Sequence, residues 1–260
     1  MRRMPKIPAF MLAGLLLASA ALAGCMIQPN RKAARHTIFV GVDASGSFMR
    51  SGHYDDSIKF LSHYLYGHLN ELGELDKPRE LFVGSIGGRT VSEPKAFHPI
   101  HDFEGKSVSE IETALRQWFP PTDDLTDFNA FFQQVARIAK ERNLVLSPIT
   151  VMVVTDGVPD VTIHGGSTNH PAKLYGKIDL KPMEYLSRNL TLRITYASPQ
   201  VSEHWRKLVP HQRVRIWTVD AEVMKGWTQQ TQAGLDPASQ DKLWKWVRDN
   251  VDYRVRSRMI

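Results

Sequence analysis

Two adjacent stretches decide the fold: the run Thr37-Ile-Phe-Val-Gly-Val42 and the polar residues that follow it, Asp43-Ala44-Ser45-Gly46-Ser47. The first is almost entirely apolar, as expected of a strand that is buried on both faces. The second begins with an acid and continues with alternating small and hydroxyl residues. Because positions two apart point the same way in an extended loop, the side chains of Asp43, Ser45 and Ser47 can converge at the end of the strand.

Strand and helix patterns alternate along the rest of the chain. Further strands are predicted at 81–86, 149–154, 190–197 and 214–219, with a short edge strand at 93–100 whose two prolines keep it off the sheet centre. Helices are predicted at 55–72, 107–118, 127–142, 202–209 and 237–251, with a short one at 183–189. Gly87-Gly88 is interpreted as a turn, and residues 157–182 as a long loop.

This alternation predicts an α/β fold of the doubly wound, Rossmann-like class. The central sheet is expected to be mostly parallel, with one antiparallel edge strand and helices on both faces. The strand at 149–154 is the most apolar and is therefore expected near the centre. Ligands of such sheets bind at the carboxyl ends of the strands, which makes the residues after each strand the candidates for a site.

A second carboxylate follows the most apolar strand, in Thr155-Asp156-Gly157. A hydroxyl at Thr126 precedes the helix at 127–142, although Thr122 could serve instead and Thr126 could simply cap that helix. Hard divalent cations prefer oxygen ligands. Two carboxylates and three hydroxyls therefore predict an octahedral metal site that keeps room for water or an outside ligand.

These motifs resemble the metal-ion-dependent adhesion site (MIDAS) of von Willebrand factor type A (VWA) domains, over about residues 36–250. The resemblance implies Mg²⁺, or Mn²⁺ or Ca²⁺, as the ion. It implies Ser45, Ser47 and Thr126 as direct ligands, and Asp43 and Asp156 as ligands that bind directly or through water. It also implies that an acidic side chain of a partner protein completes the coordination shell.

The first 24 residues have the pattern of a secretory signal peptide. Basic residues at positions 2, 3 and 6 precede an uncharged stretch that is apolar and small from 7 to 24. Leu22-Ala23-Gly24-Cys25 resembles the lipobox of bacterial lipoproteins, which implies cleavage before Cys25 and a lipid on its thiol. An uncleaved signal anchor remains the alternative, since the run is just long enough to span a bilayer. Residues 25–35 are predicted to be a tether, and 36–260 the VWA domain with its C-terminal helix and basic tail.

Composition narrows the classes of partner. The chain has 260 residues, a formal charge of +6 and a single cysteine, so an internal disulfide is excluded. Removal of residues 1–24 takes away three of the 33 basic residues and no acid, which leaves 30 against 27 acids. No concentrated basic stripe is visible, so nucleic acid is not an expected partner.

Three acyl chains would hold such a lipoprotein stably on a membrane. We expect a periplasm-facing envelope protein, with the outer membrane favoured because Met26 is not an aspartate.

The sequence gives less support to a calcium-binding EF-hand or to an enzyme. A calcium EF-hand would need glycine and an acid where the chain has Phe48 and Tyr54. A haloacid-dehalogenase-type phosphatase would need a second aspartate at Ser45. We therefore expect a non-enzymatic lipoprotein that binds a partner protein through metal, as a scaffold or adhesion component of an envelope assembly. A metal-dependent hydrolase or phosphatase and a metal-free interaction domain stay open, and neither the partner nor the oligomeric state follows from the sequence.

Overall fold

The computed structural model describes residues 36–159, 170–186 and 190–253. The predicted signal peptide at 1–24, the tether at 25–35 with Cys25, and the basic run that follows residue 253 lie outside these ranges. Within them, no helix combines the length and the apolar character that a membrane crossing would need.

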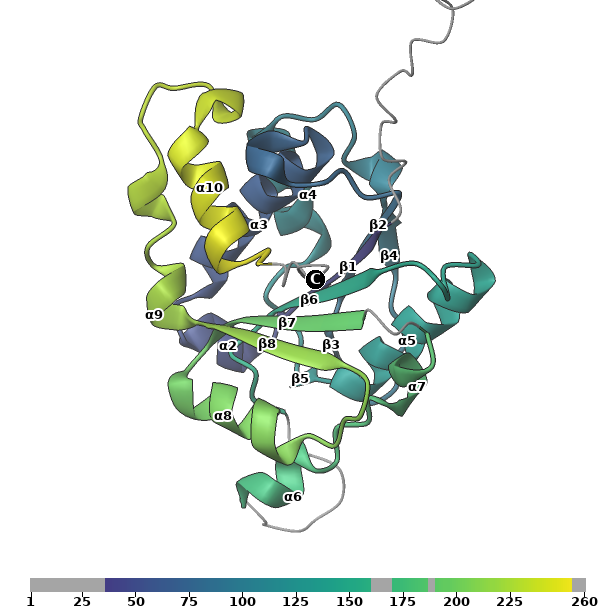
Figure 1. Cartoon of the computed structure of the whole chain (residues 1–260). Coiled ribbons are helices and arrows are strands. Elements are labelled where there is room, and N and C mark those ends of the chain that lie inside the picture. Colours follow the sequence, from purple (N-terminus) through teal and green to yellow (C-terminus); the bar gives the residue numbers. More distant parts are fainter. Residues whose placement is uncertain (1–35, 160–169, 187–189, 254–260) are drawn as a thin grey trace, which may run out of the picture. The chain divides into compact units, whose positions relative to one another are not determined.

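A six-stranded sheet in the order β4-β2-β1-β6-β7-β8 forms the centre of the described domain (Figure 1). All neighbouring strands pair in parallel except β2 and β4, which are antiparallel. The strands are β1 (Thr37–Val42), β2 (Glu80–Ser85), β4 (Phe97–Pro99), β6 (Ile149–Val154), β7 (Leu190–Ala197) and β8 (Arg215–Asp220). This is a doubly wound strand order with one antiparallel edge strand, so the predicted fold class is confirmed.

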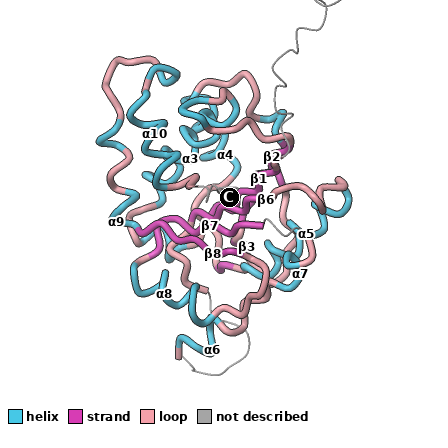
Figure 2. Tube along the Cα trace, viewed as in Figure 1, coloured by secondary structure: helices cyan, strands magenta, loops and turns pink. Residues whose placement is uncertain are grey.

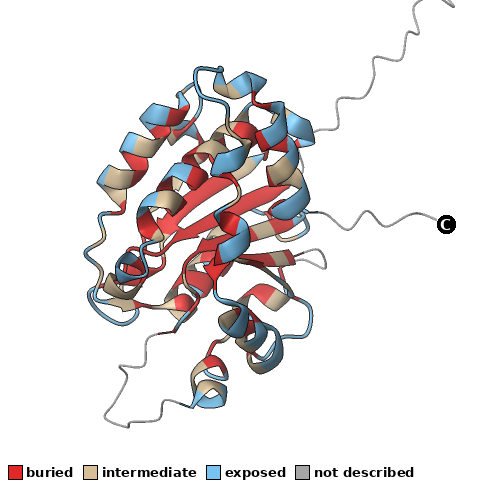
Figure 3. Cartoon of the chain, turned by 90° about the vertical axis from the view of Figure 1, so that its left-hand side faces the viewer, coloured by how far each residue is buried: buried red, intermediate tan, exposed pale blue. Residues whose placement is uncertain are grey.

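Helices cover both faces of the sheet (Figures 1 and 2). One face packs against α3, α4, α9 and α10, and the other against α5, α6, α7 and α8. The helices are α2 (Gly46–Arg50), α3 (Tyr54–Leu69), α4 (Val108–Trp118), α5 (Phe128–Glu141), α6 (Pro171–Tyr175), α7 (Lys181–Glu184), α8 (Pro199–Leu208), α9 (Ala221–Met224) and α10 (Asp241–Asn250). Figure 3 shows the strands as a buried layer between the helices, whose outer faces are exposed.

Strand alternation divides the core into two clusters. In β1, Ile38, Val40 and Val42 face one cluster while Phe39 faces the other. All six residues of β1 are buried, which explains why the sequence there is a continuous apolar run and does not alternate. The register pairs Val42 with Ser85 of β2 and with Val154 of β6. The segments that follow these three strands therefore start at the same edge of the sheet.

Several local predictions differ from the structure. Gly87-Gly88 is not merely a turn, because it forms the short strand β3 (Gly87–Gly88), which pairs with β5 (Leu125–Thr126). The edge strand predicted at 93–100 shrinks to β4. The stretch predicted as a loop at 157–182 contains the helix α6. The short helix predicted at 183–189 corresponds to α7, which starts two residues earlier, within the predicted loop. Prolines at the first turns of α6 and α7 favour helix starts, a signal that sequence analysis interpreted only as loop.

Candidate metal centre

Asp43 lies at the centre of the candidate site and is completely buried. Its backbone N–H donates to the carbonyl of Val154, which fixes the start of the loop against β6. Its Oδ1 accepts a hydrogen bond from the Ser45 N–H at 2.9 Å, and its Oδ2 accepts one from the Thr155 hydroxyl at 2.6 Å. The carboxylate is therefore held from two sides, by the chain that follows β1 and by the chain that follows β6.

Ser45 and Ser47 present their hydroxyls together, with their Oγ atoms 3.0 Å apart. Ser45 is the N-cap of α2, and its Oγ accepts from the Phe48 N–H at 3.4 Å. Phe48 is fully buried and anchors this short helix in the core. The two serine hydroxyls after β1 therefore lie side by side, as their spacing in the sequence predicts.

Thr126 is brought to the site by the short β3–β5 pair, in which it lies opposite Gly87. Its side chain is buried, and its Oγ1 lies 3.5 Å from Oδ1 of Asp43. The alternative residue Thr122 is exposed. Thr126 does not cap α5 either, since the N-cap is Asp127, whose carboxylate accepts from the Ala130 N–H at 2.9 Å.

Asp156 lies at the same edge, just after β6. It is partly exposed, and its Oδ1 accepts a hydrogen bond from the N–H of Val158 at 3.0 Å. Its negative charge acts on Asp43 and contributes to a raised pKa there. The following residue, Gly157, has a φ of +76° and is held by Trp205, whose Nε1 donates to the Gly157 carbonyl at 2.8 Å.

Burial is the main reason why the pKa of Asp43 rises from 3.8 to about 6. The hydrogen bonds from Thr155 and Ser45 oppose the shift, and the charge of Asp156 adds to it. Among the described residues, no lysine or arginine forms an ion pair with Asp43. A buried carboxylate beside a second carboxylate is unfavourable unless a positive charge joins them.

This donor set fits a hard divalent cation. Three hydroxyls and two carboxylates offer oxygen only, which suits Mg²⁺, Mn²⁺ or Ca²⁺ better than a soft or nitrogen-preferring metal. In the described ranges, no group of three or more His, Cys, Asp or Glu side chains is placed to hold a metal ion. An ion at this centre would therefore depend on the hydroxyls of Ser45, Ser47 and Thr126 as well as on the two carboxylates.

Thr155 was not predicted to have a function of its own, but its hydroxyl is a direct hydrogen-bond partner of Asp43. Its hydroxyl also accepts from the N–H of Gly157 at 2.9 Å, so it orients the carboxylate and the turn together. A hydroxyl residue at the first position after a buried strand was the available signal.

Replacing Thr155 by valine removes the hydroxyl at nearly constant side-chain volume. The hydrogen bond to the Asp43 carboxylate and the one from the Gly157 N–H are both lost. We expect the affinity for Mg²⁺ to fall about tenfold, because residues that orient ligands typically contribute that much. Isothermal titration calorimetry measures the change. Thr195→Val is the matched control, since Thr195 is equally buried in β7 and its hydroxyl donates to the carbonyl of Val153. Equal affinities in the two variants would contradict the orienting contribution of Thr155.

A second group of residues supports the position of Thr126. Asp123 bridges to the chain at Ser45, and its Oδ2 accepts from the Ser85 hydroxyl at 2.9 Å. The buried ammonium of Lys95 donates to the carbonyl of Gly87. A Cβ on Gly87 would lie only 2.3 Å from the Asp123 carboxylate, so this position needs glycine. None of these contacts is local in sequence, and sequence analysis did not find them.

Comparisons with known proteins give likenesses in fold only. No family model matches the chain, and no curated protein matches it in sequence. It is similar to the pilus adhesin SpaC from Lactobacillus rhamnosus GG in its open conformation, with a TM-score of 0.48, 11% identity, and coverage of 76% of this chain and 30% of that chain. The chain thus spans about a third of that adhesin.

Two further solved structures are similar. The SpRpn10 VWA domain has a TM-score of 0.41 and 10% identity over 79% of this chain and 93% of that one. The manganese-loaded TRAP protein of Plasmodium vivax has a TM-score of 0.40 and 18% identity over 73% and 70%. Values this low support no statement about function. The doubly wound α/β fold of this chain follows from its own strand order.

Proposed function

We propose that this domain binds a partner protein through a divalent cation, Mg²⁺ in the first place, held by Asp43, Ser45, Ser47, Thr126 and Asp156. The bound cation would supply a strong Lewis acid with an open coordination position. The chain's own residues orient that position: the Ser45 N–H and the Thr155 hydroxyl fix the Asp43 carboxylate, and the β3–β5 pair fixes Thr126.

The observation that carries this proposal is the meeting of oxygen atoms from three distant stretches around one buried carboxylate. The hydroxyl of Thr126 and the N–H of Ser45 lie against the same oxygen of Asp43, and the charge of Asp156 acts on it. If both carboxylates act through bridging waters, the oxygen atoms in direct contact with the cation are neutral, and its charge is not balanced within that inner shell. An acidic side chain from a partner is the ligand that such an ion favours.

Binding, and not catalysis, is the function that these contacts favour. The groups that hydrogen-bond to Asp43 are hydroxyls and a backbone amide, and none of them is a general base at neutral pH. We propose further that the domain is held at the bacterial envelope by a lipid on Cys25, facing the periplasm, as a scaffold or adhesion component. The signal-like residues 1–24 and the lipobox-like Leu22 to Cys25 motivate this part.

A capture experiment from envelope extract tests the proposed function. The full chain is immobilised and the bound proteins are compared in Mg²⁺ and in a chelator, with Asp43→Ala as the control. We expect a set of partners that is present only with Mg²⁺ and only for the unchanged chain. If the chelated protein and the variant retained the same partners, the metal-dependent mode of binding would be wrong.

A further inference from the structure

Three exposed apolar side chains lie in the segments that follow the three strands at the candidate metal centre. Met49, Val91 and Val158 are 42%, 46% and 41% exposed and follow β1, β2 and β6 respectively. These three strands are neighbours in the sheet, with β1 in the middle. Single exposed apolar residues are ordinary on a protein surface. Three of them in the three loops that build one site are a less ordinary arrangement, and we call Met49, Val91 and Val158 the apolar rim.

Two members of the apolar rim are tied to the site by a backbone hydrogen bond, and the third precedes a residue that makes one. The N–H of Met49 donates to the Ser45 carbonyl at 3.0 Å, and the N–H of Val158 donates to the Asp156 carboxylate at 3.0 Å. Val91 precedes Ser92, whose N–H donates to Asp127 at 2.8 Å, directly after Thr126. The backbone of Met49 and that of Val158 are therefore held next to Ser45 and Asp156, and Val91 lies one residue from the contact with Asp127.

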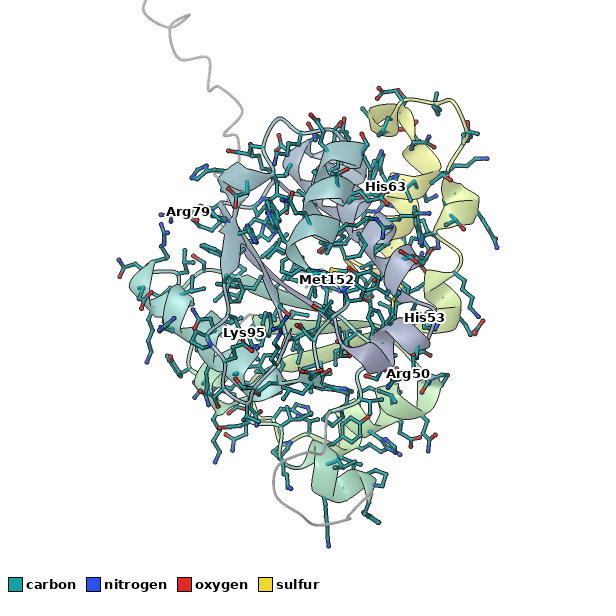
Figure 4. All side chains as sticks on the ribbon, turned by 180° about the vertical axis from the view of Figure 1, so that it is seen from behind. Arg50, His53, His63, Arg79, Lys95 and Met152 are labelled. Atoms are coloured by element: carbon teal, nitrogen blue, oxygen red, sulfur yellow. The ribbon has the colours of Figure 1, made fainter. Side chains whose placement is uncertain are left out.

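Cationic side chains accompany the rim. Arg50 follows Met49, and Arg89 lies two residues before Val91; both are exposed, and neither guanidinium forms an ion pair within the described part of the chain. Nη1 of Arg50 lies 3.1 Å from where a Cβ on Gly46 would sit, so the guanidinium reaches back toward the metal motif. Figure 4 shows Arg50 at the end of α2, beside His53.

We propose that the apolar rim, with Arg50 and Arg89, is the docking surface for an acidic protein segment in which the metal-binding carboxylate is flanked by apolar side chains. This inference rests on the proposed metal-dependent binding and deepens it by stating which partner segment the site selects. The metal and the two arginines complement negative charge, while the rim offers apolar surface that a purely polar acidic segment could not bury. Apolar surface that becomes buried in an interface adds to its affinity.

A displayed library of random 12-residue peptides is the probe. The library is selected on the immobilised full chain in Mg²⁺ and, separately, in a chelator. We expect peptides enriched only in Mg²⁺ that carry Asp or Glu with Leu, Ile, Val, Phe or Trp on either side. The most enriched peptide is then synthesised, and its affinity is measured for the unchanged chain and for two variants.

The first variant, Met49→Ser with Val158→Ser, removes most of the rim and leaves every proposed ligand in place. We expect it to bind the peptide at least tenfold more weakly while Mg²⁺ stabilises it against heat as much as the unchanged chain. The second variant, Leu146→Ser, changes a 95% exposed leucine in the loop before β6, at the other end of the strand, and should bind the peptide normally.

Two results would overturn the proposal in distinguishable ways. Mg²⁺-dependent peptides without apolar neighbours, or full binding by the Met49→Ser/Val158→Ser variant, would show that the rim does not select the partner while the metal site stands. Selection that gives the same peptides in Mg²⁺ and in chelator would contradict the metal-dependent binding itself, and the inference would fail with it.

Discussion

Replacing Asp43 by asparagine should raise the stability of the metal-free protein and abolish its response to Mg²⁺. In the metal-free state the Asp43 carboxylate is buried next to Asp156, and its pKa is raised from 3.8 to about 6. Asparagine has the same shape without the charge. The variant therefore removes the electrostatic penalty and, at the same time, the proposed anionic ligand. Residues kept for function at the expense of stability commonly behave in this way.

The size of the effect follows from the pKa shift. The rise of the Asp43 pKa from 3.8 to about 6 corresponds to roughly 3 kcal/mol, since a tenfold change in an equilibrium constant is about 1.4 kcal/mol. The amide keeps only one acceptor oxygen, so the bond from the Ser45 N–H weakens and the Thr155 hydroxyl must accept from the amide NH2 instead of donating, which together cost about 1 kcal/mol. We expect a net gain near 2 kcal/mol in the free energy of unfolding, or about 4–8 °C in Tm for a domain of this size. Thermal unfolding of the full chain in chelator measures it.

The gain should depend on pH in a defined direction. Asp43 binds its proton more tightly in the folded state, with a pKa of about 6, than in the unfolded chain, where it is near 3.9. The ionised folded form is therefore penalised fully above pH 6, and the penalty vanishes below about pH 4. The difference between Asp43→Asn and the unchanged chain should be largest at pH 7 and close to zero at pH 4.

Magnesium supplies the second readout for this variant. The unchanged chain should gain about 2.7 kcal/mol at a Mg²⁺ concentration of 100 times Kd. Asp43→Asn should gain almost nothing. Asp220→Asn, at the end of β8 where the carboxylate accepts from the Ser202 hydroxyl, is the control and should keep the full Mg²⁺ response. A normal Mg²⁺ response in Asp43→Asn would mean that this carboxylate is not part of a metal centre.

Trp205 should be the most damaging large-to-small substitution near the site. Its ring is fully buried and packs edge-on against Phe128 at 5.0 Å between ring centroids. Trp205→Ala should cost about 3–5 kcal/mol of unfolding free energy through the cavity that it leaves. Chemical denaturation of the full chain measures that loss.

Trp205→Phe separates packing from positioning. It keeps an aromatic ring but removes the N–H that holds the carbonyl of Gly157, one residue after Asp156. We expect a loss of about 2 kcal/mol, because a buried carbonyl stays unsatisfied, and a roughly tenfold weaker affinity for Mg²⁺.

Trp244→Phe is the matched control for this variant. Trp244 lies on α10, away from the site; it is 1% exposed, and its Nε1 donates at 2.8 Å to the carbonyl of Pro237. It should lose similar stability and keep normal Mg²⁺ affinity. If both phenylalanine variants lost Mg²⁺ affinity to the same degree, Trp205 would act through general stability and not through the loop that carries Asp156.

Sequence patterns predicted most of the sheet because its strands are buried. The bounds of β1, β6 and β7 match the predictions, since apolar runs end where side chains meet solvent at the strand ends. The helix at 107–118 was predicted from its capping box, and the structure has both reciprocal bonds of that motif between Ser107 and Glu110. Helix ends that lack a capping box were predicted less accurately. The helix predicted at 202–209 begins at Pro199 in the structure, with Ser198 as its N-cap.

The candidate site was predicted only in part. Convergence of Ser45 and Ser47 follows from local spacing, and Asp156 follows from the parallel pairing of β1 and β6. Whether Thr122 or Thr126 approaches Asp43 depends on the pairing of β3 with β5. That pairing needs the close approach of Asp123 to Gly87, a contact across 36 positions of sequence that leaves no periodic pattern.

The sequence by itself determined the class of fold and the kind of atoms at the site, because burial and strand alternation are local properties that each residue type expresses along the chain. Only the tertiary structure decided which oxygen atoms face one another, how strongly the Asp43 carboxylate is desolvated, and that Met49, Val91 and Val158 are exposed. These depend on distances between segments far apart in the chain, which are fixed when the sheet register and the two helical layers close together.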